Sequence, residues 1–323
     1  MEYTRREFGK LMMAGVPMSA LAVPAATPAQ TPKPDSRFGG VQIGIIAGSF
    51  RPLAPSVEDI LKLTAQAGLS AIELDVEFFE PYFGAPVVPA AARGRTSTPE
   101  EESAQRRARE DLRKWRLSPP VDRMRTLRQM YEQAGVAIEI VKFPDLGVAS
   151  MTDEEVDYCF TVAKHLGARA ITCEPPLSQT KRLGRFADRH QLIVAYHNHA
   201  NISSVEAFGR TGAWEQAFFY SKNNWANVDV GHFTAGNGKP PIDFLREYHS
   251  RITNIHLKDR KINGGPNMPW GQGDTPLREI LQLMKRESYK FTATIELEYP
   301  IPEGSSVVKE VANCVTFCKE ALA

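Results

Sequence analysis

Short apolar runs alternate with amphipathic stretches along the chain from Val41 to the C-terminus. Eight of these runs are rich in Val, Ile, Ala and Thr, a composition typical of strands that are buried on both faces. They cover 41–48, 71–78, 136–143, 170–175, 192–199, 227–232, 252–259 and 291–299. Each is followed by a stretch in which apolar residues recur with helical spacing, as in 56–68 and 152–167. The pattern therefore predicts eight strand–helix units in succession.

Regular alternation of strands and helices is typical of a parallel sheet, and eight units over residues 41–323 match the size of a (β/α)8 barrel. The alternative is an open, doubly wound sheet, which usually carries a glycine-rich phosphate turn after its first strand. The segment GSFRP at 48–52 is not such a turn. We therefore predict an α/β protein with a single TIM-barrel domain at 41–323, preceded by a linker at 31–40.

One long segment, at about 80–119, interrupts the alternation between the second strand and its helix. Thr98-Pro99-Glu100-Glu101 predicts the start of a helix, and the residues that follow carry charges of both signs with almost no apolar stripe. Such a helical insertion is typically a solvated excursion. Because loops after barrel strands lie at the catalytic end, the other interpretation is a lid or a subunit contact in a homo-oligomer.

The first thirty residues have the layout of an export signal. Arg5 and Arg6 precede a moderately apolar stretch at 11–26, and small residues follow. This order resembles a twin-arginine (Tat) signal, T-R-R-x-F-x-K, with Gly9 where Leu is commoner. The resemblance implies a signal peptide at 1–30 that is cleaved within 25–30, transport by the Tat export machinery, and a periplasmic or secreted mature protein. A chance arginine pair in a disordered terminus is the alternative.

Composition narrows the range of partners. The 323 residues include 39 Lys and Arg against 38 Asp and Glu. A chain whose net charge is close to zero lacks the positive electrostatic potential that attracts a phosphate backbone, so no nucleic-acid partner is expected. No apolar run reaches the length of a membrane span, so no stable membrane anchor is expected. Four cysteines are too few for a disulfide scaffold, and we expect free, buried thiols.

Side chains that can bind a metal ion or transfer a proton are concentrated where the predicted strands end. In a barrel these ends share one face, which is where active sites lie. From the fourth strand to the eighth, the ends carry Glu174, His197, His199, Asp229, His232, His256, Lys258, Glu296 and Glu298. Any one of them alone would read as a satisfied core residue or an ion-pair partner.

Taken together, three carboxylates at short range around one imidazole repel one another unless a cation binds among them. We therefore predict a site for one divalent metal ion. Its predicted ligands are Glu174, Asp229, His256 and Glu296. An oxygen-rich set with a single nitrogen suits Mn²⁺, with Mg²⁺, Co²⁺ and Zn²⁺ as alternatives.

The motifs ITCEP, YHNH, VDVGH, HLKD with WGQGD, and IELE stand in the order seen in xylose-isomerase-like barrels. From about Val41 to its end, the chain resembles this family of sugar (phosphate) isomerases and epimerases, which is related to endonuclease IV. Its ketose 3-epimerases imply the same four ligands. They also imply that His232, in D-x-G-H, lies near substrate oxygens. Because Glu298 shares a strand face with Glu296, the ligand on the eighth strand could shift by two residues.

The departures from endonuclease IV also carry information. That enzyme binds three zinc ions and needs extra histidines after its second and third strands. Here those strands end in Phe78-Phe79 and Phe143-Pro144, and the loop after the seventh strand lacks the further D-x-H ligands. A trinuclear DNA-repair site is therefore not expected.

The residues and the resemblance together predict a sugar isomerase or epimerase that works through an enediolate. Glu174 and Glu296 would flank the reacting carbon, one removing the proton and the other returning it. The residues predicted to contact the carbohydrate substrate are His199, His232, Lys258 and Trp270, with Glu73 as a weaker candidate.

Export and the lack of a phosphate cradle favour a free or keto sugar over a sugar phosphate. One alternative is a lyase or hydrolase that uses the same enolate on an oxidised glycoside. The other is a non-catalytic, exported barrel that binds carbohydrate, although binding alone does not require two flanking glutamates.

Overall fold

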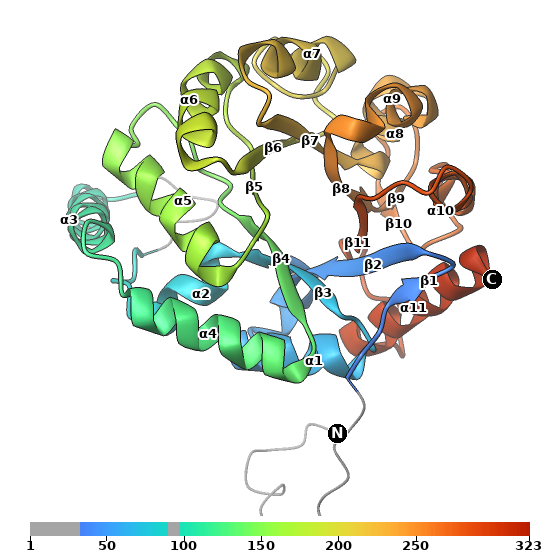
Figure 1. The fold of residues 1–323 in the computed structure, drawn as a ribbon, viewed down its shortest axis with the longest axis horizontal. Helices are drawn as coiled ribbons and strands as arrows, with labels where there is room; N and C mark the ends of the chain where they lie inside the picture. The colour runs from blue at the N-terminus through green and yellow to red at the C-terminus, as the bar shows by residue number, and fades with distance from the viewer. Residues whose placement is uncertain (1–32, 90–96) are drawn as a thin grey trace, which may run out of the picture. The chain divides into compact units, whose positions relative to one another are not determined.

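Eight parallel strands close into a barrel, which confirms the predicted (β/α)8 fold. In this computed structural model, which describes residues 33–89 and 97–323, the strands surround a central axis and the helices lie outside them (Figure 1). In order of neighbours around the ring, the strands are β2 (Val41–Ile46), β11 (Thr292–Ile295), β8 (Ile252–Leu257), β7 (Asn224–Asp229), β6 (Ile193–His197), β5 (Ala170–Cys173), β4 (Ala137–Lys142) and β3 (Ala71–Asp75). Pairing of β3 with β2 closes the ring. The predicted signal at 1–30 lies outside the described residues.

Helices cover the outside of the ring, and most of them are amphipathic, as their apolar spacing predicts. They are α1 (Val57–Gln66), α2 (Val76–Phe83), α3 (Pro99–Arg116), α4 (Val121–Ala134), α5 (Asp153–Leu166), α6 (Thr180–His190), α7 (Thr211–Tyr220), α8 (Val230–Asn237), α9 (Ile242–Tyr248), α10 (Leu277–Arg286) and α11 (Val307–Leu322). Three two-residue strands, β1 (Arg37–Phe38), β9 (Asp259–Arg260) and β10 (Asn267–Met268), lie outside the barrel ladder. Helix α5 begins with the capping box expected from Thr152 and Glu155.

All eight predicted strands extend beyond the observed carboxyl ends, and in two of them the excess residues form the start of an α-helix. The chain leaves β3 after Asp75 to form α2, and it leaves β7 after Asp229 to form α8. At the second position the aspartate itself starts the helix, because its Oδ1 accepts a hydrogen bond from the backbone N–H of His232 at 2.6 Å. The apolar pattern alone cannot separate a strand end from the first turn of a buried helix. Strand β7 also begins at Asn224, before the predicted start at 227.

The helical insertion is anchored at one end by an ion pair between the half-buried Arg116 and the buried Glu80. Helix α3 lies outside α5 (Figure 1), and all of its residues are exposed or half-buried. The Arg116 guanidinium donates hydrogen bonds to both carboxylate oxygens of Glu80 at 2.9 and 3.1 Å, and it lies 3.6 Å from Glu155. This bidentate pair ties the end of α3 to the end of α2 and to α5.

The four cysteines are free and buried, as expected from their number and positions: Cys159, Cys173, Cys314 and Cys318. Burial raises the pKa of the Cys314 thiol to about 12, which makes it a packing residue rather than a nucleophile. Within residues 33–89 and 97–323, no helix combines the length and apolarity that a membrane crossing needs.

Candidate active site

A cavity of about 230 Å³ opens at the carboxyl ends of the strands. Nearly every strand of the ring contributes a charged or imidazole side chain to it. These residues are Arg51, Asp75, Lys142, Glu174, His197, His199, His232, Lys258, Glu296 and Glu298. A concave site with so many titratable groups at this end of a barrel is where catalysis is expected.

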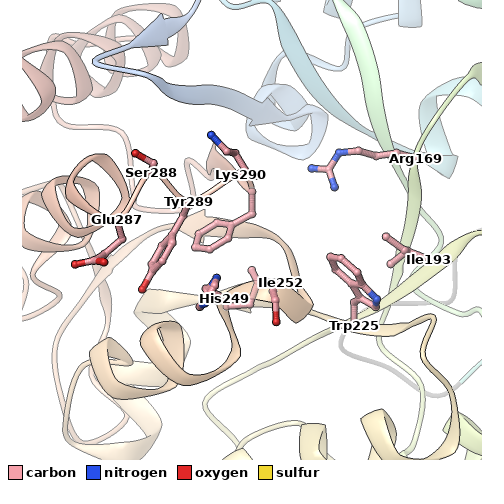
Figure 2. A pocket seen from close by; sticks show the side chains of 11 residues that line it. Arg169, Ile193, Trp225, His249, Ile252, Glu287, Ser288, Tyr289 and Lys290 are labelled. Carbon is pink, nitrogen blue, oxygen red and sulfur yellow. The ribbon is translucent and has the colours of Figure 1, made fainter.

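A larger cavity, of about 490 Å³, lies at the opposite end of the barrel (Figure 2). Its walls include Ile193 and Ile252, the first residues of β6 and β8, and Trp225. The rings of His249 and Tyr289 stack there with centroids 4.9 Å apart. This end of a TIM barrel typically serves stability, so the smaller cavity is the candidate active site.

Four buried side chains meet beneath the smaller cavity. Potential ligand atoms of His197, Asp229, His256 and Glu296 all lie within 4.8 Å of one another. The His197 Nε2 is 3.0 Å from His256 Nδ1, which is itself 2.9 Å from Glu296 Oε2. Three of these residues are predicted metal ligands, and His197 is the member that the sequence prediction omitted.

The donor set has the properties that a divalent cation requires. Asp229 Oδ2 and Glu296 Oε2 are buried carboxylate oxygens that share one ammonium group, that of Lys258, at 2.9 and 3.0 Å. Burial and the charges of Lys142 and His256 hold the pKa of His197 well below its usual value, so its imidazole is neutral and able to bind metal. Burial would lower the pKa of His256, but Glu73 and Glu296 raise it to about 10, so its imidazole has to lose a proton when a metal ion binds. Two imidazole nitrogens and two carboxylates suit Mn²⁺, Co²⁺ or Zn²⁺ better than Mg²⁺.

Glu174 lies one imidazole away from this group. Its Oε2 is 2.9 Å from His199 Nε2, its Oε1 is 2.9 Å from Lys142 Nζ, and His197 Nδ1 is 3.6 Å from the same Oε1. Burial alone would raise the pKa of Glu174, but the hydrogen bond with His199 and the charge of Lys142 hold it well below its usual value. Glu174 is therefore ionised, and His197 connects it to the other predicted ligands.

Lys258 reaches into the centre of the carboxylates. Its Nζ lies 2.9 Å from Asp229 Oδ2, 3.0 Å from Glu296 Oε2 and 2.7 Å from Glu298 Oε2. Burial would lower the pKa of this lysine, but the three carboxylates raise it, so it remains an ammonium ion. The same ammonium is 3.2 Å from His232 Nε2. Lys258 thus neutralises part of the charge that a metal ion would otherwise balance.

Local sequence explains why these side chains meet. The side chain of Asn198 bonds both backbone groups of Asp229, accepting from N–H at 2.8 Å and donating to C=O at 3.1 Å. This locks the end of β6 to the end of β7. Gly231 is required because a Cβ there would lie 2.5 Å from the carbonyl oxygen of Lys258. The asparagine of YHNH and the glycine of D-x-G-H are therefore positioning residues.

The other predictions fare differently. His199, His232 and Lys258 line the cavity, as a substrate contact must. Trp270 instead packs against Phe317 and lines a separate surface hollow. After β11, it is Glu296 that joins the buried group, whereas Glu298 lies at the cavity rim with 42% of its side chain exposed.

Sequence reasoning gave no role to four titratable cavity residues, Arg51, Asp75, Lys142 and His197. His197 was recognised at the end of its strand but was not assigned to the site, and Asp75 and Lys142 were passed over as parts of apolar strand runs. Alternation along a strand places His197 on the same face as His199, and Asp75 on the same face as Glu73. A lysine at the end of a buried strand, as in Lys142, also demands a nearby carboxylate.

Comparison with known proteins agrees with this geometry. A family model for the xylose isomerase-like TIM barrel matches residues 61–315. No curated protein matches the chain. A sugar phosphate isomerase/epimerase from Parabacteroides distasonis is 14% identical, with TM-score 0.55 over 94% of this chain and 100% of that chain. The probable 3-DHS dehydratase AsbF from Bacillus anthracis is 13% identical, with TM-score 0.60 over 85% and 98%. The IolI protein with a bound zinc atom is 12% identical, with TM-score 0.60 over 88% and 99%. These likenesses concern the fold.

Proposed function

The chain belongs to the xylose isomerase-like TIM barrel family, and we propose that it is a divalent-metal-dependent isomerase or epimerase that acts on a free or keto sugar. The observation that carries this proposal is the buried group of His197, Asp229, His256 and Glu296 beneath a cavity lined by ionised carboxylates and two lysines. Structural neighbours include proteins described as a sugar phosphate isomerase/epimerase and as a zinc-bound protein.

The proposed ligands of the ion are the four members of that group, with Glu174 as a further ligand from the sequence prediction. A bound ion would act as a Lewis acid on a substrate carbonyl and its adjacent hydroxyl. Mn²⁺ is the proposed ion. The second imidazole, that of His197, makes Mg²⁺ the least suitable alternative.

Two glutamates are placed to move the proton. Glu174 follows β5 and Glu296 follows β11, and these two strands are separated by three others on one side of the ring and by three on the other. The two carboxylates therefore approach the cavity from opposite walls. Both are ionised, because neighbouring charges hold their pKa values below the usual range despite burial. Either one can accept a proton from a carbon held between them.

The face that receives the returned proton decides the product. If the opposite glutamate returns it to the same carbon, the substrate is epimerised. If it is returned to the neighbouring carbon, an aldose and a ketose interconvert. The ammonium groups of Lys142 and Lys258 line the same cavity and would stabilise negative charge on substrate oxygens during the transfer.

A neutral substrate suits the charge of the cavity. The cavity and the layer beneath it contain three cationic side chains, those of Arg51, Lys142 and Lys258, and five carboxylates. A divalent ion would bring the net formal charge of these groups close to zero. These carboxylates are Asp75, Glu174, Asp229, Glu296 and Glu298. A polyhydroxylated sugar without phosphate or carboxylate therefore suits the site better than a charged one.

Proton NMR in D₂O tests the proposed reaction. The Mn²⁺-loaded and metal-free forms of the protein are incubated with a panel of free and keto sugars. We expect a new isomer or epimer, together with deuterium at the carbon beside the carbonyl, in the metal-loaded samples alone. Release of a substituent instead would identify a lyase of the kind that a dehydratase neighbour suggests. Absence of turnover by metal-loaded protein across the panel would contradict the enzyme proposal.

Export is proposed on the order of residues in the N-terminal segment. Arg5 and Arg6, the apolar stretch and the small residues after it are in the sequence of a Tat signal. Replacing both arginines with lysine keeps the charge but removes the guanidinium pair that a receptor reads. We expect this precursor to stay in the cytoplasm, whereas Arg37→Lys, beyond the signal, is exported. Unchanged export of the double variant would contradict the proposal.

A further inference from the structure

Glu73, in the middle of β3, places a carboxylate inside the barrel below the cavity. Its side chain is almost fully shielded from solvent, at 2% exposure. A buried carboxylate is costly unless donors satisfy it. Three donors do so. The hydroxyl of Thr172 bonds Oε1, while the Asn254 amide and the His256 imidazole both bond Oε2 at 2.8 Å.

The contact with His256 determines which ring nitrogen carries a proton. An ionised carboxylate can only accept, so the Nε2 of His256 must donate to Glu73. The Asn227 amide nitrogen lies 3.1 Å from the same Nε2, and its Oδ1 has no hydrogen-bond partner among the described residues. Turning this carboxamide by 180° would let Oδ1 share the Nε2–H, which agrees with the same protonation.

The opposite ring nitrogen, Nδ1 of His256, faces the proposed metal site. It lies 3.0 Å from His197 Nε2 and 2.9 Å from Glu296 Oε2, within the group of four. A proton on Nδ1 can be replaced by a metal ion, whereas the proton on Nε2 remains on Glu73. We propose that Glu73 is a positioning residue that fixes the Nε2–H tautomer and the ring plane of His256, so that Nδ1 is the metal-binding atom.

This inference rests on the proposed metal site and goes beyond it. Glu73 lies on a different strand from the proposed ligands and does not line the cavity. Its carboxylate is held by groups from β5 and β8, so its orientation is fixed before any metal binds. Carboxylates that orient a metal-binding histidine typically contribute 10- to 100-fold to metal affinity.

Glu139 provides a matched control. It lies on the neighbouring strand β4, and its carboxylate also accepts from a threonine hydroxyl, that of Thr292, and from Arg169. It contacts no residue of the proposed metal group. Glu73→Gln and Glu139→Gln each remove one charge from a hydrogen-bonded glutamate in the barrel, so both lower stability, but only the first touches His256.

The experiment measures the Zn²⁺ dissociation constant of each variant by competition with a chromophoric chelator. We expect Glu73→Gln to weaken binding about 10- to 100-fold, and Glu139→Gln to leave it within about twofold. Equal affinity of Glu73→Gln and wild type would overturn the role of Glu73 but leave the metal site intact. Failure of wild type to bind Zn²⁺ would overturn both this inference and the proposed function.

A second measurement covers the case in which Glu73→Gln does not fold. Wild-type protein with ¹⁵N-labelled histidine is loaded with Zn²⁺ and its imidazole signals are recorded by NMR. We expect His256 to show a protonated Nε2 and a metal-shifted Nδ1. A protonated Nδ1 in the loaded protein would overturn the proposal without any variant. A purely structural ion pair does not select a tautomer, so this readout separates the two roles.

Discussion

At the scale of single residues, two buried lysines govern the behaviour of the site. Lys142 lies 2.9 Å from Glu174, and Lys258 lies 3.0 Å from Glu296. Each proposed acid–base glutamate therefore has an ammonium partner that keeps it ionised. The carboxylates are ready to accept protons, and they can release them again only because the substrate anion formed in the reaction is a still stronger base.

Replacing either glutamate with glutamine tests their shared role. Glu174→Gln and Glu296→Gln keep the side-chain size but remove a proton acceptor, so each should lower turnover about 10²- to 10⁴-fold. The double variant should be little worse than either single variant, because one missing partner already stops the proton transfer. Turnover is compared at saturating Mn²⁺ to separate chemistry from metal occupancy. Near-normal turnover in both single variants would contradict the mechanism.

Glu298→Gln is the control for the register on the last strand. Glu298 contacts Lys258 at the cavity rim but is not part of the buried group. We expect this variant to keep most of its turnover and its metal content. If it instead lost both while Glu296→Gln kept them, Glu298 would be the ligand and the assignment would be wrong by two residues.

Asp75 predicts a pH dependence of stability. Burial raises its pKa to about 7, although Lys142 acts in the opposite direction. In the unfolded chain this carboxyl ionises above about pH 4, so folding becomes less favourable as the pH rises from there to about 7. In Asp75→Asn the side chain cannot ionise, so the variant's free energy of unfolding does not show this decrease with pH. Urea unfolding of metal-free protein should therefore show the variant gaining roughly 2–3 kcal/mol on wild type between pH 5 and pH 8. A stability difference independent of pH would contradict the raised pKa.

At the scale of elements, the turn from β7 into α8 fixes the site. Asp229 uses Oδ1 to cap α8, which leaves Oδ2 directed at the proposed ion. Gly231, in the first turn of α8, lies against the backbone of Lys258, the residue that directly follows β8. Because the glycine has no Cβ, the two backbones can approach closely here. This close approach brings the Asp229 carboxylate and the Lys258 ammonium together.

Gly231→Ala should disturb this contact. The added Cβ would meet the Lys258 carbonyl oxygen at 2.5 Å, so the backbone must shift, at a cost of about 1–3 kcal/mol. We expect lower thermal stability and weaker metal binding. Gly212→Ala, in α7, is the control, because its Cβ would find no described atom nearer than 3.9 Å. Alanine favours a helix over glycine, so the control should match or exceed wild-type stability. Similar losses in both variants would contradict the argument.

The sequence predicted the elements better than their ends. Runs of β-branched residues located all eight barrel strands, because a strand buried on both faces has no polar side. The ends at Asp75 and Asp229 were missed, since whether the next apolar residues continue a strand or enter a helix depends on tertiary packing. Tertiary packing also decides the position of Trp270. This residue was expected in the site, but its loop folds onto α11 through Phe317.

At the scale of the whole molecule, closure of the ring assembles the site. Linear sequence showed that Glu174 and Glu296 both follow strands, but their opposition across the cavity comes from the order of strands around the barrel. Closure also sets His197 between Glu174 and the other ligands. Which imidazole joins a metal group is decided by distances of a few ångströms that no spacing along the chain specifies.

The central claim is that this ring of strand ends holds one divalent ion. Wild-type protein and His256→Ala are dialysed against Mn²⁺ or Zn²⁺, and the metal bound per chain is counted by mass spectrometry, with circular dichroism to confirm that both are folded. We predict one tightly bound ion per wild-type chain and a large loss in the variant. A folded wild-type protein without a stoichiometric ion, or a folded His256→Ala that retains it, would contradict the account.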